Sequence, residues 1–175
     1  MKRLPAALRT KAAKIKLLLL DVDGVLTDGG IYIDDRGGET KRFDVRDGQG
    51  ITLLRRAGIE VGFISGRSSN VVRHRAKELG VKILYQNAHN KADIYDRIRR
   101  ANRLEDEQIA YIGDDLVDLP VLQKVGLAVT VRDSWSVVKP EVDYITRAVG
   151  GRGAVREVAE LLLRAREVRK RRIKK

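Results

Sequence analysis

The sequence contains no cysteine, only 3 prolines and few aromatic residues, which make up 5% of its 175 positions. The absence of cysteine excludes disulfides, thiolate zinc sites and cysteine nucleophiles, and it fits a reducing cytoplasm. The apolar runs are far shorter than the roughly 20 residues that a membrane span needs. The basic N-terminal segment lacks the apolar core of ~7–15 residues of a secretory signal. These absences favour a cytoplasmic protein that does not bind membranes.

The composition, 43% apolar and 34% charged, is typical of a soluble globular chain, and its length predicts one domain spanning residues 1–175. The net charge of +12 resides in the two ends. Residues 1–16 hold six Lys/Arg and no acid, and residues 164–175 hold eight against one Glu, so the remainder is close to neutral. We interpret 1–15 and 164–175 as basic ends that are either solvated or anchored to a polyanion. No aromatic residues interleave with these charges, which makes nucleic acid an unlikely partner.

Apolar strand-like runs alternate with helical patterns along the whole chain. "KIKLLLLDV", "IEVGFIS", "VKILYQ", "QIAYIG" and "LAVTV" indicate strands, and the segments between them have helical spacing, including "LVDLPVLQKVG". Unbroken apolar strands separated by helices are typical of a parallel sheet that is covered on both faces. The pair "GIYID" and "TKRFDV" around "DRGG" indicates a β-hairpin. The expected fold is α/β: a Rossmann-like, doubly wound parallel sheet with a small hairpin after the first strand. Trp135 is expected to contribute to packing.

Polar side chains follow four of these strands. In such sheets, sites form beyond the carboxyl ends of the strands, so these side chains are expected to converge on one crevice. They are Asp21 and Asp23, then Ser65 and Arg67, then Asn90 and Lys91, and finally Asp114, Asp115 and Asp118.

Carboxylates from two strand ends, without nearby histidine or cysteine, suit a hard cation with oxygen ligands, above all Mg²⁺. A magnesium ion beside a lysine and a hydroxyl makes a site for a phosphoryl group. One free carboxylate can attack phosphorus, and a second can protonate the leaving oxygen and then activate water. Asp21 and Asp23 suit these two tasks because residues i and i+2 of a strand point the same way.

Each of the other residues also has a purely structural interpretation. Ser65 can be a helix N-cap, since "SGRSSN" opens a helix. Lys91 can be a surface lysine, although a cation at a helix start is unfavourable unless an anion compensates it. Asp115 and Asp118 can be solvated acids in the first turn of the next helix.

"DVDGVLTD", "FISGR", the pair Asn90–Lys91 and "GDDLVD" resemble, in order and spacing, the four motifs of haloacid dehalogenase-superfamily phosphatases. The resemblance implies that Asp21 is the nucleophile and Asp23 the general acid/base, with the Asp23 backbone carbonyl also on magnesium. It implies further roles for five residues: phosphoryl binding by Ser65 and Lys91, magnesium binding by Asp114, and support of the metal and of Lys91 by Asp115 and Asp118.

The chain leaves no room for the extra cap domain of many superfamily members. The interval from Gly24 to Phe63 has about 40 residues, mostly hairpin and helix, and the interval from Arg67 to Asn90 is shorter. A capless site would be open to water, whereas phosphoryl transfer benefits from shielding. We therefore expect either a macromolecular substrate or a lid from another subunit.

Further segments, among them "TDGGIYIDDRGGETKRFDVRDGQGI" and "GGRGAVREV", are similar to the capless 3-deoxy-D-manno-octulosonate 8-phosphate phosphatases of lipopolysaccharide biosynthesis. This resemblance implies a homotetramer, a phosphorylated sugar acid as substrate, and substrate contacts by Arg46, Arg67 and Arg152. Arginines suit an acidic sugar because the guanidinium grips a carboxylate bidentately. The three glycines around Arg152 imply a flexible approach or a plain turn.

Three other functions are weighed against this one. Phosphatases of nine-carbon keto-deoxy sugar acid 9-phosphates are similar but carry glutamate at the position of Arg67. The open site and basic ends suit a polynucleotide-end or phosphoprotein phosphatase. A non-catalytic binding module is disfavoured because Asp21, Asp23, Lys91 and Asp114 are all present.

Overall fold

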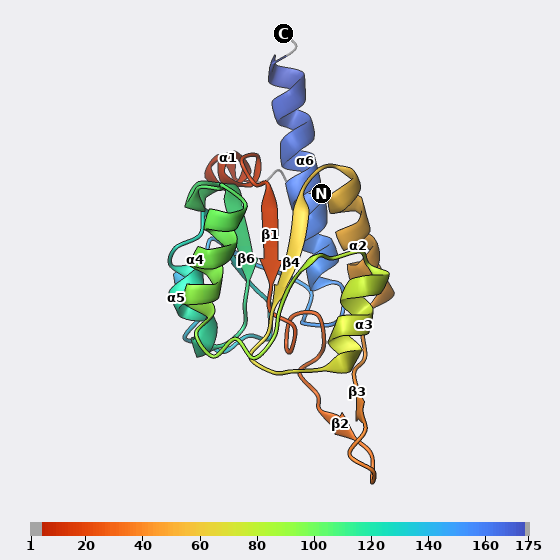
Figure 1. The fold of residues 1–175 in the computed structure, drawn as a ribbon. Helices are drawn as coiled ribbons and strands as arrows, with labels where there is room; N and C mark the ends of the chain where they lie inside the picture. Colours follow the sequence, from red (N-terminus) through yellow and green to blue (C-terminus); the bar gives the residue numbers. More distant parts are fainter. Residues whose placement is uncertain (1–4, 174–175) are drawn as a thin grey trace.

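A six-stranded parallel sheet forms the centre of the computed structural model, which describes residues 5–173 of the chain, with side chains described up to residue 167 (Figure 1). The strand order is β5-β4-β1-β6-β7-β8, so the first strand lies in the middle and the chain winds outward in both directions. The expected doubly wound α/β fold is confirmed. The strands are β1 (Leu17–Leu20), β4 (Glu60–Ile64), β5 (Ile83–Tyr85), β6 (Ile109–Ile112), β7 (Leu127–Thr130) and β8 (Tyr144–Ile145).

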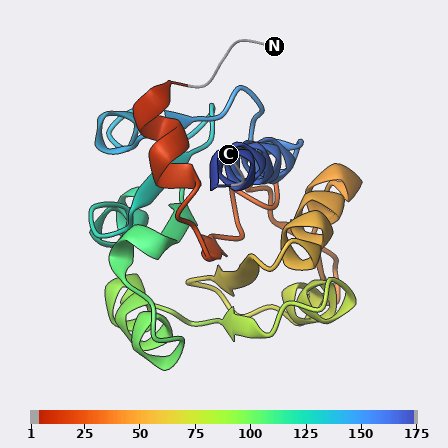
Figure 2. The ribbon, with the colours of Figure 1, turned by 90° about the horizontal axis from the view of Figure 1, so that it is seen from above.

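The four leucines of β1 are buried because helices cover both faces of the sheet. Leu18 and Leu20 pack into one apolar cluster, and Leu17 and Leu19 pack into the other. This alternation follows from the two-residue period of a strand. The view along the strands shows α6 and α1 on one side of the sheet and α4 on the other (Figure 2).

The first cluster is closed by α1, α2, α3 and α6, and the second by α4 and α5. The side chains of Asp44, Ser69 and Asn90 cap the N-termini of α2, α3 and α4, where they accept hydrogen bonds from backbone N–H groups. The helices are α1 (Ala6–Ala12), α2 (Val45–Arg56), α3 (Asn70–Glu78), α4 (Lys91–Ala101), α5 (Leu119–Leu122) and α6 (Ala154–Ile173), with 3₁₀ turns η1 (Asp106–Gln108), η2 (Leu116–Asp118) and η3 (Lys139–Glu141).

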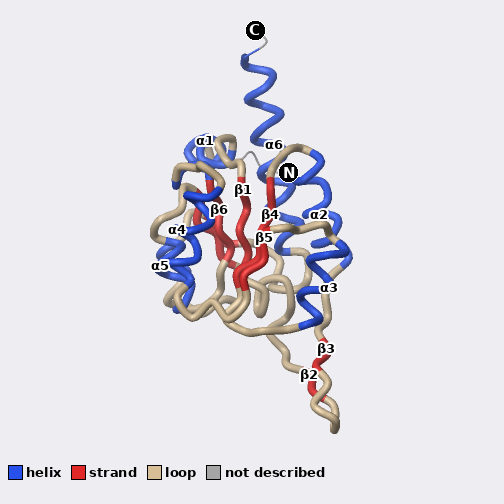
Figure 3. Tube along the Cα trace, in the orientation of Figure 1, coloured by secondary structure: helices blue, strands red, loops and turns tan. Residues whose placement is uncertain are grey.

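The expected hairpin is present as two short antiparallel strands, β2 (Tyr32–Ile33) and β3 (Glu39–Thr40). The Asp34 carboxylate closes the turn by accepting hydrogen bonds from the N–H groups of Arg36 and Gly38. The hairpin projects from the end of the molecule at which β1 finishes (Figure 3).

Three elements differ from the sequence-based expectation. The expected helix over 116–126 is a 3₁₀ turn followed by the four-residue α5; Pro120, in the first turn of α5, lacks the N–H that would bond back into η2, which separates the two. Helix α1 and strand β8 were not predicted. Leu8 and Ala12 of α1 are buried in the first cluster, so residues 6–12 of the basic N-terminal end are packed on the body.

Helix α6 carries the basic C-terminal end away from the sheet (Figure 1). Residues 1–4 and 174–175, and the side chains of 168–173, lie outside the described part, and with them most of the C-terminal charge. Within the described residues, no helix combines the length and the apolar character needed to cross a membrane.

Candidate active site

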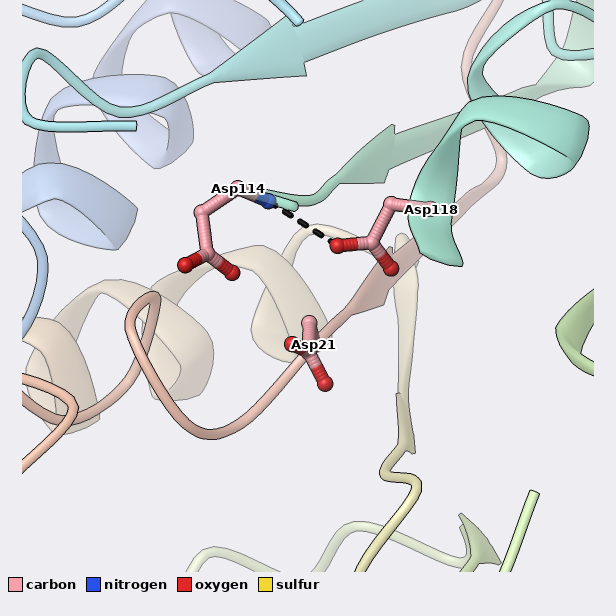
Figure 4. A group of neighbouring side chains, drawn as sticks. All are labelled: Asp21, Asp114 and Asp118. Atoms are coloured by element: carbon pink, nitrogen blue, oxygen red, sulfur yellow. Dashed lines mark hydrogen bonds between the residues drawn. The ribbon is translucent and has the colours of Figure 1, made fainter. Parts of the chain in front are cut away.

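Three carboxylates meet at the carboxyl ends of the two central strands. Asp21 follows β1, Asp114 follows β6, and Asp118 lies in η2. Figure 4 shows the three side chains turned toward one another, and one oxygen of each lies within 4.8 Å of the others. The sequence predicted that Asp21 and Asp114 converge here, although 93 positions separate them.

Gly24 makes room for this arrangement. A Cβ at Gly24 would lie 2.1 Å from Oδ2 of Asp114, and the backbone of Gly24 has φ +90°, which disfavours other residues. A side chain at this position would therefore push the Asp114 carboxylate away from the end of β1.

The Asp118 carboxylate is fully buried and accepts four hydrogen bonds. Oδ1 accepts from Lys91 Nζ at 2.7 Å and from Tyr111 Oη at 2.5 Å. Oδ2 accepts from the N–H groups of Asp114 and Asp115 at 3.0 and 3.2 Å. Both oxygens of Asp118 are thus engaged by the protein. The sequence did not identify Tyr111 as part of the site; its place in an apolar strand gave no sign of it.

Asp114 differs, because its Oδ1 is buried and has no hydrogen-bond partner among the described residues. Burial is the main cause that raises the pKa of Asp114 to about 8, with repulsion from Asp21 and Asp118 adding to it. The pKa of Asp21 is raised to about 7, again first by burial and then by Asp118. A divalent cation would relieve this crowding, and the all-oxygen donor set fits Mg²⁺.

Lys91 is the first residue of α4, and its side chain is 3% exposed. Its ammonium lies 3.0 Å from Asp21 Oδ1 and 2.7 Å from Asp118 Oδ1. Burial by itself lowers the pKa of Lys91, but the two carboxylates outweigh it and the net pKa is raised. The two carboxylates supply the anion that a lysine at a helix start requires. The interpretation of Lys91 as a surface lysine is wrong.

Ser65 is buried directly after β4 and does not cap a helix. Its Oγ accepts a hydrogen bond from the N–H of Arg67 at 3.2 Å, while Ser69 caps α3. Its backbone oxygen accepts from Ala88 N at 3.0 Å, which ties it to the loop that leads into Lys91. The N-cap interpretation of Ser65 is therefore wrong.

Asp115 and Asp118 have different surroundings. Asp115 is half-buried and caps η2, accepting from Leu116 N at 2.6 Å. Asp118 is 0% exposed, so the interpretation of this residue as a solvated acid is wrong.

Asp23 is held by residues of the hairpin and of the loop after β4. Its Oδ1 lies 2.5 Å from Lys41 Nζ, and its Oδ2 lies 3.9 Å from Arg67 Nε. Glu39 lies 3.1 Å from Arg67 Nη2 and 3.2 Å from Lys41 Nζ. Arg67 therefore lies at the site, as predicted. The sequence analysis did not identify Lys41 and Glu39 as site residues. The only local signal for them is their spacing of two residues, which places both on one face of a strand.

Arg46 and Arg152 lie together at the starts of α2 and α6. The Arg46 guanidinium donates to both oxygens of Asp44, at 3.0 and 2.7 Å, and to the backbone oxygen of Arg152 at 3.0 Å. These contacts join α2 to the loop before α6. The Arg152 side chain is exposed on that loop.

The glycines around Arg152 serve close packing. A Cβ at Gly150 would lie 1.8 Å from the backbone oxygen of Gly24, and one at Gly151 would lie 2.4 Å from Thr27 C. The backbone of this loop is therefore packed against the turn that follows β1, which favours a fixed turn over a flexible segment, while the Arg152 side chain stays exposed. Trp135 lies on the same edge of the sheet, where its backbone N–H donates a hydrogen bond to the backbone oxygen of Asp114 at 3.1 Å. Trp135 is 67% exposed, so the expectation that it contributes to packing is wrong.

The chain is similar both to a protein-family model and to individual known proteins. Residues 44–126 match the model of the haloacid dehalogenase-like hydrolases. The 3-deoxy-D-manno-octulosonate 8-phosphate phosphatase KdsC of Escherichia coli strain K12 is 49% identical over 155 residues, which cover 89% of this chain and 82% of the relative.

Two solved structures are similar over nearly the whole chain. The 3-deoxy-D-manno-octulosonate 8-phosphate phosphatase of Yersinia pestis has a TM-score of 0.93 at 44% identity and covers 94% of this chain and 89% of its own. The phosphatase of the same name from Moraxella catarrhalis, solved with magnesium, phosphate and KDO, has a TM-score of 0.90 at 41% identity and covers 95% of each chain.

Proposed function

The chain belongs to the haloacid dehalogenase-like hydrolases, within their 3-deoxy-D-manno-octulosonate 8-phosphate phosphatase family, and we propose that it hydrolyses that sugar-acid phosphate. Family membership makes it a phosphoric monoester hydrolase. The observation that carries the substrate proposal is the meeting of Asp21, Asp114 and Lys91 in a chain so similar to these phosphatases.

We assign the magnesium ligands to Asp21, the backbone carbonyl of Asp23, and Asp114. The unpartnered Oδ1 of Asp114 supports this choice, whereas both oxygens of Asp118 already accept hydrogen bonds. When bound, Mg²⁺ supplies positive charge that neutralises the phosphoryl oxygens. Asp118 then acts on the Lys91 ammonium, which it holds toward Asp21.

In the first step, a carboxylate oxygen of Asp21 forms a bond to phosphorus while the bond from phosphorus to the sugar oxygen breaks. Asp23 gives its proton to that oxygen, so the sugar leaves as an alcohol and an aspartyl-phosphate remains on Asp21. In the second step, water gives a proton to Asp23 and attacks phosphorus, which releases phosphate and restores Asp21. Ser65 and Lys91 hold the phosphoryl oxygens throughout.

The sugar-acid carboxylate is assigned to Arg67, whose guanidinium lies 3.9 Å from Oδ2 of Asp23. Arg46 and Arg152 lie at the starts of α2 and α6, where both are exposed. We infer that these two bind substrate in the assembled protein, with Arg152 reaching the site of a neighbouring subunit.

We also propose that the chain forms a homotetramer through the hairpin. Ile31, Tyr32 and Ile33 are 52%, 50% and 65% exposed on a segment that projects from the body. A cluster of exposed apolar side chains on a projecting segment favours contact with another chain. Such an assembly can supply the lid that this capless site lacks.

The proposal is tested by measuring phosphate release from a panel with and without Mg²⁺. The panel contains 3-deoxy-D-manno-octulosonate 8-phosphate, a nine-carbon keto-deoxy sugar acid 9-phosphate, a 5′-phosphorylated oligonucleotide and a phosphopeptide. We expect the highest kcat/KM for the octulosonate and no turnover in the presence of a chelator. A higher kcat/KM for any other substrate would refute the proposed specificity.

A further inference from the structure

A buried lysine of the hairpin contacts the proposed acid/base residue. The Lys41 side chain is 1% exposed, and its ammonium lies between Asp23 Oδ1 at 2.5 Å and Glu39 Oε1 at 3.2 Å. Lysine is almost never fully buried unless it is paired. Here both partners are carboxylates, and one of them is proposed to take part in the reaction.

Glu39 is itself fixed by several donors. Its Oε2 accepts from Ser69 Oγ at 2.5 Å, and its Oε1 lies 3.1 Å from Arg67 Nη2. The hydrogen bond from Ser69 is the main cause that lowers the pKa of Glu39, and Arg67 and Lys41 contribute. Glu39 therefore stays ionised and gives Lys41 a fixed anionic partner, anchored through Ser69 to the start of α3.

The two oxygens of Asp23 are in different surroundings. Oδ1 is bound to Lys41, whereas Oδ2 faces Arg67 Nε at 3.9 Å, beyond hydrogen-bond distance. The Asp23 side chain is 22% exposed and would rotate more freely without this anchor. A proton donor must lie within hydrogen-bond reach of the leaving oxygen, so a loss of orientation reduces the rate.

We propose that Lys41 is a positioning residue, which holds Oδ1 of Asp23 so that Oδ2 exchanges the proton with the leaving oxygen and then with water. This inference rests on the proposed function. In the step concerned, the phosphorus–oxygen bond breaks as Asp21 bonds to phosphorus, and the proton on Oδ2 passes to the departing oxygen. Lys41 contributes no proton and no bond to substrate.

The test compares two phosphate esters whose leaving groups differ in their need for a proton. The sugar alcohol of 3-deoxy-D-manno-octulosonate 8-phosphate needs protonation as it departs, whereas 4-nitrophenolate does not. In Lys41→Met we expect kcat/KM for the sugar phosphate to fall by about tenfold or more, but by no more than the ~10²–10⁴-fold that a positioned acid contributes in total. We expect a much smaller loss for 4-nitrophenyl phosphate, and recovery of most of the activity in Lys41→Arg.

A second comparison uses Asp23→Asn. If Lys41 acts through Asp23, adding Lys41→Met to Asp23→Asn causes no further loss, because residues that act as one unit are not additive. Lys124→Met is the matched control: it breaks a lysine–carboxylate pair with Asp96 at 2.9 Å, outside the described site residues, and should leave both kcat/KM values unchanged.

An equal loss on both esters, or a further loss in the double variant, would overturn the positioning role while the wild-type chain remains a phosphatase. Inactivity of the wild-type chain on both esters would instead refute the proposed function. Glu39→Gln weakens the anchor of Lys41 without removing the lysine. It should lower kcat for the sugar phosphate selectively and to a smaller extent, and measuring kcat apart from KM separates this loss from an effect on substrate binding by Arg67, which Glu39 also contacts.

Discussion

Lys91 Nζ lies 2.7 Å from Asp118 Oδ1, although 27 positions separate the two residues and they belong to different helical elements. Both side chains are almost completely buried, with 3% and 0% exposure. The pair links the start of α4 to η2, and it directs the ammonium toward Asp21.

Replacing Asp118 with Asn should destabilise the protein by about 1–3 kcal/mol, because buried donors lose an acceptor while Lys91 keeps Asp21 at 3.0 Å as its anionic partner. In the variant, an NH₂ group replaces one of the two oxygens and cannot accept a hydrogen bond. Depending on its orientation, it faces either Lys91 and Tyr111 or the two backbone N–H groups. Chemical denaturation measures the change. Asp96→Asn, which breaks an exposed pair with Lys124, is the control and should change the free energy of unfolding by less than about 1 kcal/mol.

Replacing Asp21 with Asn should abolish turnover, with a fall in kcat of about 10⁴-fold or more, because the nucleophile is lost. The melting temperature of the metal-free protein at pH 8 should not fall. The site raises the pKa of Asp21 to about 7, so it disfavours the charge that Asn lacks. Phosphate-release assays and thermal melts check both parts. Activity that persists in pure Asp21→Asn would contradict the nucleophile assignment.

The stability of the metal-free protein should fall as pH rises through the range in which Asp114 titrates. Its pKa is raised from 3.8 to about 8, so between these values the folded state binds more protons than the unfolded state. Stability therefore decreases with pH across this window. In chelator, wild type should lose stability relative to Asp114→Asn between about pH 5 and about pH 8. Added Mg²⁺ should raise the melting temperature of wild type more at the higher pH.

Replacing Gly24 with Ala should remove activity by displacing the Asp114 carboxylate, which lies 2.1 Å from the position of the new Cβ. Gly37→Ala is a matched control, because Gly37 also has a positive φ, +77°, but has no atom within 4 Å of a Cβ. Each change should destabilise the chain by about 1 kcal/mol through backbone strain. Only Gly24→Ala should weaken Mg²⁺ binding, as measured by calorimetry. Equal activity in the two variants would contradict this account.

Replacing Ile33 with Asp should dissociate the proposed tetramer and lower kcat/KM, since a charge would occupy the exposed apolar face of the hairpin. Light scattering gives the solution mass. Asp35→Lys, a change between charged residues near the hairpin turn, should leave the mass unchanged. A wild-type chain that is monomeric and fully active would refute the assembly.

The central sheet could be predicted because Leu17–Leu20 and the other apolar strands are buried on both faces, which removes the alternation of an exposed strand. The hairpin was predictable from its glycine-containing turn. Helix α1 was missed because Lys and Arg surround its few buried residues, and β8 because its two residues form no pattern. The break between η2 and α5 depended on a single residue, Pro120.

Within the site, the residues that directly follow strands were predictable, since the fold class alone brings them to one edge. Tyr111 and Lys41 were not, because each contributes through a side chain that reaches from another element. Tyr111 meets Asp118 from β6, and Lys41 meets Asp23 from the hairpin. Such contacts depend on tertiary distances that local sequence patterns do not specify.

Helix α6 begins at the edge of the sheet that holds the carboxylates and runs past the opposite edge (Figure 1). A surface tether or purification tag joined to the end of this helix would lie at the pole of the subunit remote from the crevice. The chain can therefore be immobilised through its last helix with the substrate entrance still facing solution.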